Sequence, residues 1–142
     1  NDAPSSLTRL LDMGIEPFLI ASSVVGILAQ RLVRVICAKC KASYRPEAGV
    51  TRELELQGSA TLFRGKGCEA CQRTGYKGRV GIFELLLMDE PVKNLVVSKA
   101  SAHAMREVGR QAGMRTLRAD GLAKAMAGVT TVEEVMRVTQ LE

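Results

Sequence analysis

Four cysteines are the residues of this sequence whose type and spacing best suit chemistry. They form two pairs, Cys37-Ala-Lys-Cys40 and Cys68-Glu-Ala-Cys71, with 27 residues between them. Two thiolates three residues apart on a tight turn hold two corners of a tetrahedron, and a second pair completes it. The spacing therefore predicts one structural Zn²⁺ ion bound by Cys37, Cys40, Cys68 and Cys71, in a closed site without a catalytic role.

Other chemistry of the cysteines stays open at this point. An iron–sulfur cluster or another metal ion uses the same ligands. Two disulfides would suit a small secreted protein, but four cysteines in 142 residues are not a disulfide-dense composition. A redox-active CxxC pair would leave the other pair unexplained. A four-cysteine site has no need of the single histidine, His103, which we interpret as an ordinary helix residue.

The sequence offers no catalytic residues and, apart from the cysteines, no assigned cofactor-binding residues. A phosphate-binding loop needs a glycine five residues before Gly-Lys and a Ser or Thr after it, and the only Gly-Lys, at Gly65, meets neither condition. The glycines at 75, 78 and 81 do not fit a dinucleotide-binding fingerprint. We therefore expect the isolated chain to hydrolyse no ATP.

The positive charge of the chain is concentrated around the cysteines. Residues 37–80 carry nine basic and four acidic side chains, whereas residues 1–36 carry three of each and residues 81–142 eight of each. Four thiolates and one Zn²⁺ ion add a charge of −2, which lowers the local excess to about +3. Because the metal centre balances part of this charge, the charge is weak support for nucleic-acid binding.

Two other classes of zinc protein remain as alternatives. A zinc-ribbon nucleic-acid-binding module would explain the positive charge, but a binder of single strands uses more stacking platforms than Tyr44, Phe63 and Tyr76 provide. A chaperone zinc domain of the DnaJ type would explain the second cysteine pair, which is followed by x-x-Thr-Gly. However, Cys40 is followed by Lys-Ala-Ser-Tyr, without the glycine of that repeat.

Three segments position these residues in a predicted α+β, mostly helical fold. Residues 1–36 predict the end of a larger α/β domain, residues 37–80 a tetracysteine zinc-binding subdomain, and residues 81–142 a strand followed by a helical subdomain. The longest apolar run, over residues 18–29, is shorter than the ~20 residues of a membrane-spanning helix. The chain starts at Asn1 and not at Met, so we expect a piece of a longer protein.

Capping signals and apolar periodicity predict the individual elements. Asp2 and Pro4 predict a first helix, Pro17 predicts a second, and residues 27–36 predict a strand. A short helix is expected over residues 51–57 and a buried strand over residues 79–88. Four more helices are then expected: one opened by Pro91, one capped by Ser101 with Met105 and Val108 inward, one from about Met114 to Met126, and one with a Thr131–Glu134 capping box.

The sequence resembles the C-terminal region of a bacterial type II secretion ATPase. The opening NDAPSSLTRLLDMGIEPFLIASSVVGILAQRLVR resembles the end of the ATPase domain in general secretory pathway protein E and in the related type IV pilus assembly ATPases. The resemblance continues through both cysteine pairs and TGYKGRVGIFELL at residues 74–86, so that it covers essentially the whole chain.

This resemblance implies a fold and a function for the intact protein. The chain would be the end of a RecA-like α/β ATPase domain followed by a small four-cysteine zinc subdomain and a C-terminal helical bundle. The P-loop, the Walker B acid and a histidine box would lie before Asn1, so ATP and Mg²⁺ would belong to the intact protein only. The protein would be a cytoplasmic homo-hexamer, associated with the inner membrane through platform proteins, that powers pseudopilus assembly and export across the outer membrane.

Two sets of basic residues carry further expectations. Arg31 and Arg34 either end a strand in solvent or approach nucleotide or a neighbouring subunit in the intact enzyme. The basic side chains of the cysteine segment either only offset the thiolate charge, or contact acidic surfaces of platform proteins or the anionic membrane face. No nucleic acid is expected as a partner. The basic residues are Lys39, Lys41, Arg45, Arg64, Lys66, Arg73, Lys77 and Arg79.

Overall fold

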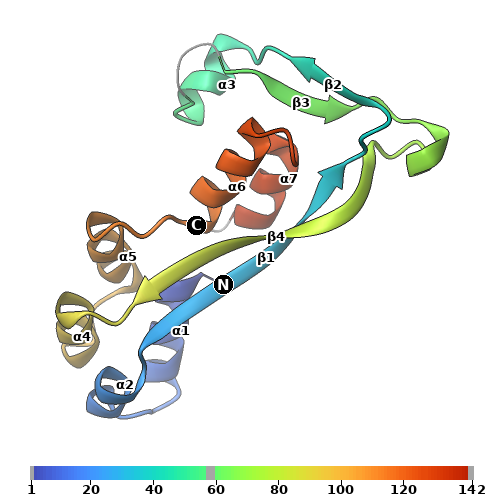
Figure 1. The fold of residues 1–142 in the computed structure, drawn as a ribbon. Helices are drawn as coiled ribbons and strands as arrows, with labels where there is room; N and C mark the ends of the chain where they lie inside the picture. Colours follow the sequence, from blue (N-terminus) through green and yellow to red (C-terminus); the bar gives the residue numbers. More distant parts are fainter. Residues whose placement is uncertain (1, 57–59, 141–142) are drawn as a thin grey trace. The chain divides into compact units, whose positions relative to one another are not determined.

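The computed structural model describes residues 2–56 and 60–140 of the chain. These residues form α-helices, two small sheets and one 3-10 turn, labelled in Figure 1, and confirm the predicted α+β class. In chain order the elements are α1 (Ala3–Asp12), α2 (Pro17–Ser23), β1 (Gly26–Ile36), β2 (Lys41–Tyr44), α3 (Ala48–Glu53), β3 (Leu62–Gly65), η1 (Glu69–Cys71), β4 (Tyr76–Leu87), α4 (Glu90–Val97), α5 (Ala102–Gln111), α6 (Leu117–Met126) and α7 (Val132–Thr139).

The chain forms two compact units, each assembled from separate stretches of sequence. Among the described residues, the first unit comprises 2–30 and 83–117, and the second comprises 31–56, 60–82 and 118–140. The strands β1 and β4 pair in a two-stranded sheet, and each strand contributes residues to both units. The second unit contains all four cysteines.

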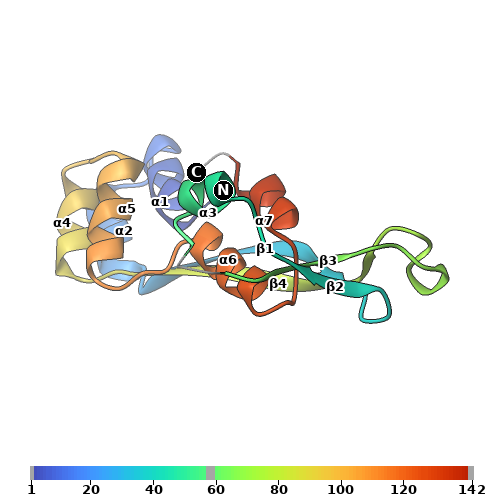
Figure 2. The same ribbon diagram turned by 90° about the horizontal axis from the view of Figure 1, so that it is seen from above.

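Helices dominate the first unit, and their starts follow the predicted capping signals. The Asp2 carboxylate accepts the Ser5 N–H at 3.0 Å and also pairs with Arg106 of α5. Ser101 caps α5 by accepting the Ala104 N–H at 3.2 Å. Helix α2 packs on α4, and α5 packs on α1 and α4 (Figure 1, Figure 2).

A buried carboxylate joins the starts of two helices to β4 in this unit. The side chain of Glu84 is only 1% exposed. Its oxygens accept the N–H of Ala3 at 2.8 Å and the N–H of Leu117 at 3.0 Å, the first residues of α1 and α6. The positive ends of two helix dipoles therefore face one buried anion, which offsets the cost of burying it.

The predicted strand over residues 79–88 forms, but it is not buried on both sides. In β4 the side chains alternate, so that Glu84 and Leu86 are buried while Phe83, Leu85 and Leu87 are 42%, 49% and 60% exposed. The continuous apolar run suggested two covered faces, whereas among the described residues each strand of the β1–β4 ribbon is buried on one side only.

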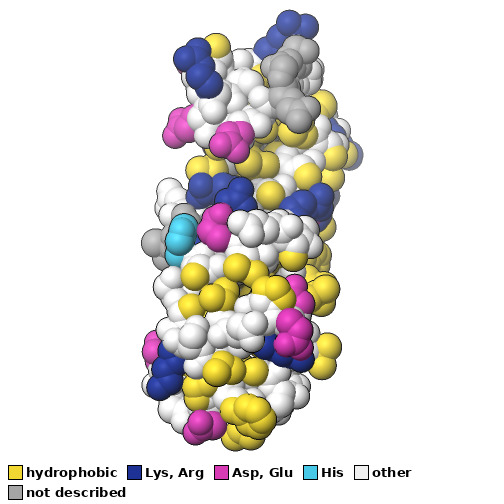
Figure 3. All heavy atoms as spheres, turned by 90° about the vertical axis from the view of Figure 1, so that its left-hand side faces the viewer, with side chains coloured by type: hydrophobic (Ala, Val, Ile, Leu, Met, Phe, Trp, Pro, Cys, Tyr) yellow, Lys and Arg dark blue, Asp and Glu magenta, His cyan; other side chains and the backbone are white. Residues whose placement is uncertain are grey.

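Exposed apolar side chains also gather on the helices of the first unit. Phe18, Leu19 and Val97 on α2 and α4 are 68%, 55% and 54% exposed. The lower part of Figure 3 shows hydrophobic side chains over these two helices. These side chains and the outward ones of β4 are the exposed large apolar residues of this unit that an interaction surface could use.

The second unit has its own core between the β2–β3 hairpin and helices α6 and α7. The hairpin is antiparallel, with Lys41 opposite Gly65 and Tyr44 opposite Leu62. A Cβ atom at Gly121 would lie 2.6 Å from the Val135 side chain, so glycine permits close packing of α6 on α7. The buried residues of this core are Leu56, Ala60, Leu62, Ala125, Val132 and Val135.

Several predicted boundaries are wrong by a few residues. The helix expected over 51–57 is α3 at Ala48–Glu53, because Glu55 takes a left-handed conformation (φ 54°) that ends it. Residue 57 lies outside the described residues. The helix expected from Met114 begins at Leu117, whose N–H is held by the Glu84 carboxylate. Val108 is only half-buried, although Met105 is fully buried as expected. None of the described helices combines the length and apolar character that crossing a membrane requires.

Candidate metal centre

The four cysteines, which lie far apart in sequence, come together at one point in the second unit. Their sulfur atoms all lie within 4.8 Å of one another. The Sγ–Sγ distances are 3.8 Å for Cys37–Cys68, 3.9 Å for Cys40–Cys71 and 3.7 Å for Cys68–Cys71. Four sulfurs at ~2.3 Å from a tetrahedral zinc ion would be about 3.8 Å apart. The donor set and its spacing therefore fit Zn²⁺, and the cysteines are free thiols and not disulfides.

Short turns after β1 and around η1 present the two cysteine pairs. Cys37 directly follows β1, and Cys40 directly precedes β2. Cys68 stands before the 3-10 turn η1, and Cys71 ends it. Gln72 then adopts a left-handed conformation (φ 54°) that turns the chain back toward β4. Each pair is thus held on a turn of the kind that places two thiolates on adjacent corners of a tetrahedron.

Backbone N–H groups donate to two of the sulfurs. The Cys71 sulfur accepts the N–H groups of Cys68 at 3.3 Å and Gly75 at 3.2 Å, and the Cys40 sulfur accepts the Gly67 N–H at 3.3 Å. Burial raises the pKa of Cys71, but these donors and the neighbouring thiols outweigh it and lower the pKa to about 6. Burial raises the pKa of Cys40 to about 11. The backbone donors at Cys71 therefore favour its thiolate form, the form that binds a metal ion.

Close backbone contact brings the two pairs together. The Cys37 N–H donates to the Gly75 carbonyl at 2.9 Å, and the Lys66 N–H donates to the Cys40 carbonyl at 3.1 Å. A Cβ atom at Gly65 would lie 2.1 Å from the Gly75 carbonyl oxygen, a distance that no side chain tolerates. Glycine at position 65 is therefore required by the approach of the two backbones.

Glu134 of α7 is a buried residue whose contacts the sequence did not predict. The Thr131 hydroxyl accepts the Glu134 N–H at 3.1 Å, which confirms the cap, but the Glu134 carboxylate does not complete the capping box. It accepts the Arg34 N–H at 2.8 Å and the Arg34 Nη2 at 2.7 Å instead, as well as two donors of Arg137. Burial raises the pKa of Glu134, and the hydrogen bonds from Arg137 and Arg34 outweigh it and lower the pKa to about 2.

Arg31 and Arg34 of β1 therefore have partners within the chain. Arg34 pairs with Glu134, and its guanidinium lies 4.1 Å from the centre of the Tyr76 ring. Arg31 donates to the Val138 carbonyl at 2.6 Å. Neither arginine simply ends a strand in solvent, because both side chains contact the C-terminal helix.

The remaining residues singled out in the sequence lie on the surface. All eight basic side chains named for the cysteine segment are exposed. Two of them also lie over aromatic rings of the hairpin, with Lys41 at 4.8 Å from the centre of Phe63 and Arg64 at 4.8 Å from that of Tyr44. His103 is exposed on α5 and is the cyan side chain in Figure 3. It lies in the first unit and contributes nothing to the cysteine cluster.

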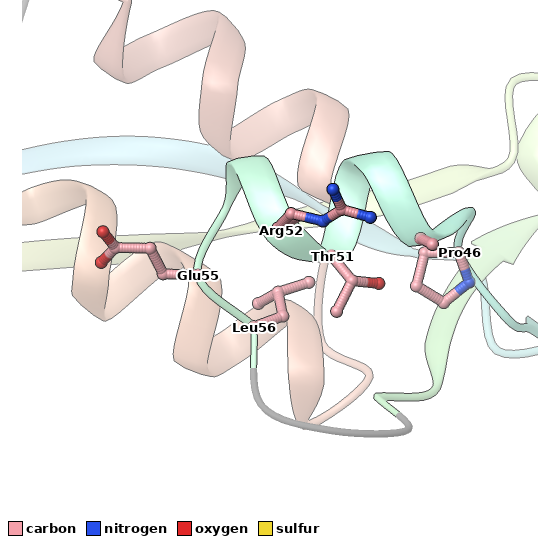
Figure 4. Close-up of a pocket in the computed structure, with 6 residues that line it drawn as sticks. Pro46, Thr51, Arg52, Glu55 and Leu56 are labelled. Atoms are coloured by element: carbon pink, nitrogen blue, oxygen red, sulfur yellow. The ribbon is translucent and has the colours of Figure 1, made fainter.

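A depression of about 540 Å³ beside α3 is a separate feature of the second unit. Figure 4 shows that the side chains of Arg52 and Glu55 point away from one another there. Because its polar groups do not converge, this depression lacks the arrangement typical of a small-molecule site. Its lining residues are Pro46, Ala48, Thr51, Arg52, Glu55 and Leu56.

Comparison with known proteins shows which family the sequence of this chain matches. The family described as Type II/IV secretion system protein matches residues 1–137. The type IV pilus assembly ATPase PilB of Thermus thermophilus is 47% identical over 98% of this chain and 16% of its own length. The type II secretion system protein E of Pseudomonas aeruginosa is 46% identical over 100% of this chain and 28% of its own length. The type II secretion system ATPase E of Vibrio cholerae is 46% identical over 99% of this chain and 28% of its own length. The chain therefore spans less than a third of these relatives.

Proposed function

This chain belongs to the Type II/IV secretion system protein family, and we propose on that basis that it is the metal-binding C-terminal region of a secretion ATPase. The intact protein, as a homo-hexamer, would hydrolyse ATP with Mg²⁺ to power pseudopilus assembly and protein export by type II secretion. A type IV pilus assembly ATPase is the alternative, since relatives with both names match at similar identity. Residues 37–80 would be its zinc subdomain, between the end of the ATPase core at 1–36 and the C-terminal part at 81–142.

The observation that carries the metal role is the spacing of the four sulfurs. Three of the six Sγ–Sγ separations are 3.7 to 3.9 Å, close to the edges of a tetrahedron around Zn²⁺, and all six are within 4.8 Å. Four sulfur ligands around one ion would leave no position for a substrate. Such a closed site stabilises structure and carries out no reaction. Cys37, Cys40, Cys68 and Cys71 would supply all the ligands, and the ion would fix the shape of a segment that has little apolar core of its own.

Metal analysis tests this role. The purified chain should contain one zinc ion per molecule, and Cys68→Ser should lose the zinc together with the order of residues 37–80. The loss should be local, because α1, α4 and α5 have a separate core. His103→Ala is the matched control and should keep the full zinc content. A wild-type chain without zinc, or a Cys68→Ser chain with residues 37–80 still ordered, would contradict the proposal.

The catalytic part of the proposal concerns the intact protein. The resemblance in the sequence assigns the P-loop and the Walker B acid to the region before Asn1, and the 142 residues contain no loop suited to hold β- and γ-phosphates. The isolated chain should therefore show no ATP turnover above background, whereas the intact protein should hydrolyse ATP. Turnover by the isolated chain would overturn this division of roles.

The proposed partners are inner-membrane platform proteins, contacted from the cytoplasm. This rests on the exposed basic side chains around the metal centre, which suit an acidic protein surface, and the anionic membrane face is the alternative. In the intact ATPase, reversing Arg64, Lys66 and Lys77 to Glu should weaken association with platform proteins, and salt should weaken the wild-type association. Reversing Lys93 and Arg110 of the first unit is the control. Unchanged affinity with zinc retained would leave the module as a stabiliser only, and a salt-dependent shift with random DNA would favour the nucleic-acid alternative.

A further inference from the structure

Four side chains of the second unit form a closed ring of contacts beside the metal centre. Glu134 of α7 binds Arg34 of β1 through the two hydrogen bonds of 2.8 and 2.7 Å. The Arg34 guanidinium lies 4.1 Å from the centre of the Tyr76 ring at the start of β4. The Tyr76 hydroxyl then lies 2.7 Å from the hydroxyl of Thr131, the residue that caps α7. The ring therefore begins and ends on the same helix.

Arg34 and Tyr76 stand at the two points where the chain enters and leaves the metal centre. Arg34 comes three residues before Cys37. Tyr76 directly follows Gly75, whose N–H donates to the Cys71 sulfur at 3.2 Å and whose carbonyl accepts the Cys37 N–H at 2.9 Å. A shift of either residue would therefore move backbone groups that touch or carry the metal ligands.

The turn before α7 strengthens the same attachment. The Thr130 hydroxyl donates to the Arg34 carbonyl at 2.7 Å, and the Ile36 N–H donates to the Val129 carbonyl at 3.0 Å. Arg34 and Ile36 belong to the last three residues of β1. Residues 129–134 thus hold the strand that leads into the first cysteine pair through backbone and side-chain contacts together.

We infer that Glu134 is a positioning residue of the metal centre, through which helix α7 fixes the bases of both cysteine pairs by way of Arg34 and Tyr76. This inference rests on the proposed zinc role of the four cysteines. Its physical basis is that the buried carboxylate needs its donors, so Arg34 is held in the one position that also stacks on Tyr76. Without the carboxylate, Arg34 is less restrained, and the chain segments before Cys37 and after Gly75 become more mobile together.

Coupling of this kind acts in both directions. A helix that stabilises the metal-bound geometry is itself stabilised when the metal binds, by the same factor. A residue that only packs α7 against the core would lower stability equally with and without zinc. The two roles therefore differ in whether the effect of the substitution depends on the metal.

The test compares Glu134→Gln with Glu133→Gln, its exposed neighbour on α7, in the whole zinc-loaded chain. Zinc release to an excess of a chromogenic chelator should be about tenfold faster for Glu134→Gln and unchanged for Glu133→Gln, in the range seen for groups that support metal ligands. Tyr76→Phe keeps the ring but removes the hydroxyl, and should accelerate release about threefold, below that range, because only one contact of the ring is lost. It carries the test if Glu134→Gln does not fold. Zinc removal should also accelerate hydrogen exchange of the amides of residues 132–139 in the wild type more than in Glu134→Gln.

The possible results distinguish the positioning role of Glu134 from the zinc role of the cysteines. A wild-type chain that binds no zinc would overturn both. A zinc-loaded wild type whose release rate matches that of Glu134→Gln and Tyr76→Phe would overturn the positioning role alone and leave the zinc role intact. The positioning role is also wrong if zinc removal changes the exchange of α7 equally in the wild type and in Glu134→Gln.

Discussion

Glu134→Gln is expected to destabilise the second unit by about 3 kcal/mol at neutral pH. The pKa of Glu134 is lowered from 4.5 to about 2 in the folded chain. One pKa unit corresponds to about 1.4 kcal/mol, so a difference of about 2.5 units gives roughly 3 kcal/mol. Because the folded-state pKa is the lower one, this stability is fully present above pH ~4.5 and is lost as the pH falls toward 2.

The sequence supplies a suitable probe for this measurement. Its two tyrosines, Tyr44 and Tyr76, both lie in the second unit, and it has no tryptophan. Urea unfolding followed by tyrosine fluorescence therefore reports on this unit alone. Both proteins should be kept in excess Zn²⁺ and their zinc content checked at each pH, because the metal-free chain would lose the order of residues 37–80, where both tyrosines lie.

The expected difference in unfolding free energy is about 3 kcal/mol at pH 7 and about half of that at pH 3. Glu133→Gln should remain within about 0.5 kcal/mol of the wild type, as is usual for exposed substitutions. A difference for Glu134→Gln that stays constant across this pH range would refute the reasoning, because it would show that the charge of the carboxylate is not what the arginines stabilise. A difference below about 1 kcal/mol at pH 7, less than one pKa unit, would refute it as well.

Three further experiments test other features of the structure. Glu84→Gln leaves one buried N–H without its acceptor, so it should lower the unfolding free energy of the first unit by about 1–3 kcal/mol. Far-UV circular dichroism during unfolding measures this, and a loss below about 0.5 kcal/mol would contradict the role of the carboxylate. Gly65→Ala should weaken zinc binding at least about tenfold in chelator competition because its Cβ has no room, whereas Gly49→Ala, which has no atom within 4 Å, should not change it. Replacing the exposed Leu85 and Leu87 of β4 by Thr should raise the concentration at which the isolated chain aggregates, as measured by light scattering, without lowering its melting temperature. Aggregation at an unchanged concentration would show that these two side chains do not cause it.

Local signals in the sequence predicted much of the fold. Asp2, Ser101 and Thr131 all cap helices as expected, because a capping side chain acts on a backbone group only three residues away. The CxxC spacing predicted that the four cysteines meet, since two such turns have few other uses in one chain. The resemblance to secretion and pilus ATPases is confirmed by the family match and by relatives at 41–47% identity.

Features that depend on distant partners could not be predicted from the sequence. Glu134 has the spacing of a capping box, but its carboxylate binds Arg34, 100 residues away, and Arg137 instead of the nearby cap N–H. The apolar run of β4 suggested a fully buried strand, since a sequence does not say how many layers cover a strand. The end of α3 depends on a single left-handed residue, Glu55, and glutamate rarely adopts this conformation.

Because these contacting residues are far apart along the chain, they are synthesised at different times on the ribosome. Cys37 and Cys68 are 31 residues apart, whereas Arg34 and Glu134 are 100 residues apart. Glu134 follows Cys71 by 63 residues, which take roughly 3 to 13 s to add at ~5–20 residues per second. The nascent chain therefore displays a complete set of thiols for several seconds before the helix that secures them exists. If the four cysteines bind zinc as proposed, a polypeptide that stops short of α7 would leave the ribosome with all four thiols but without Glu134, and it would release the metal faster than the finished chain.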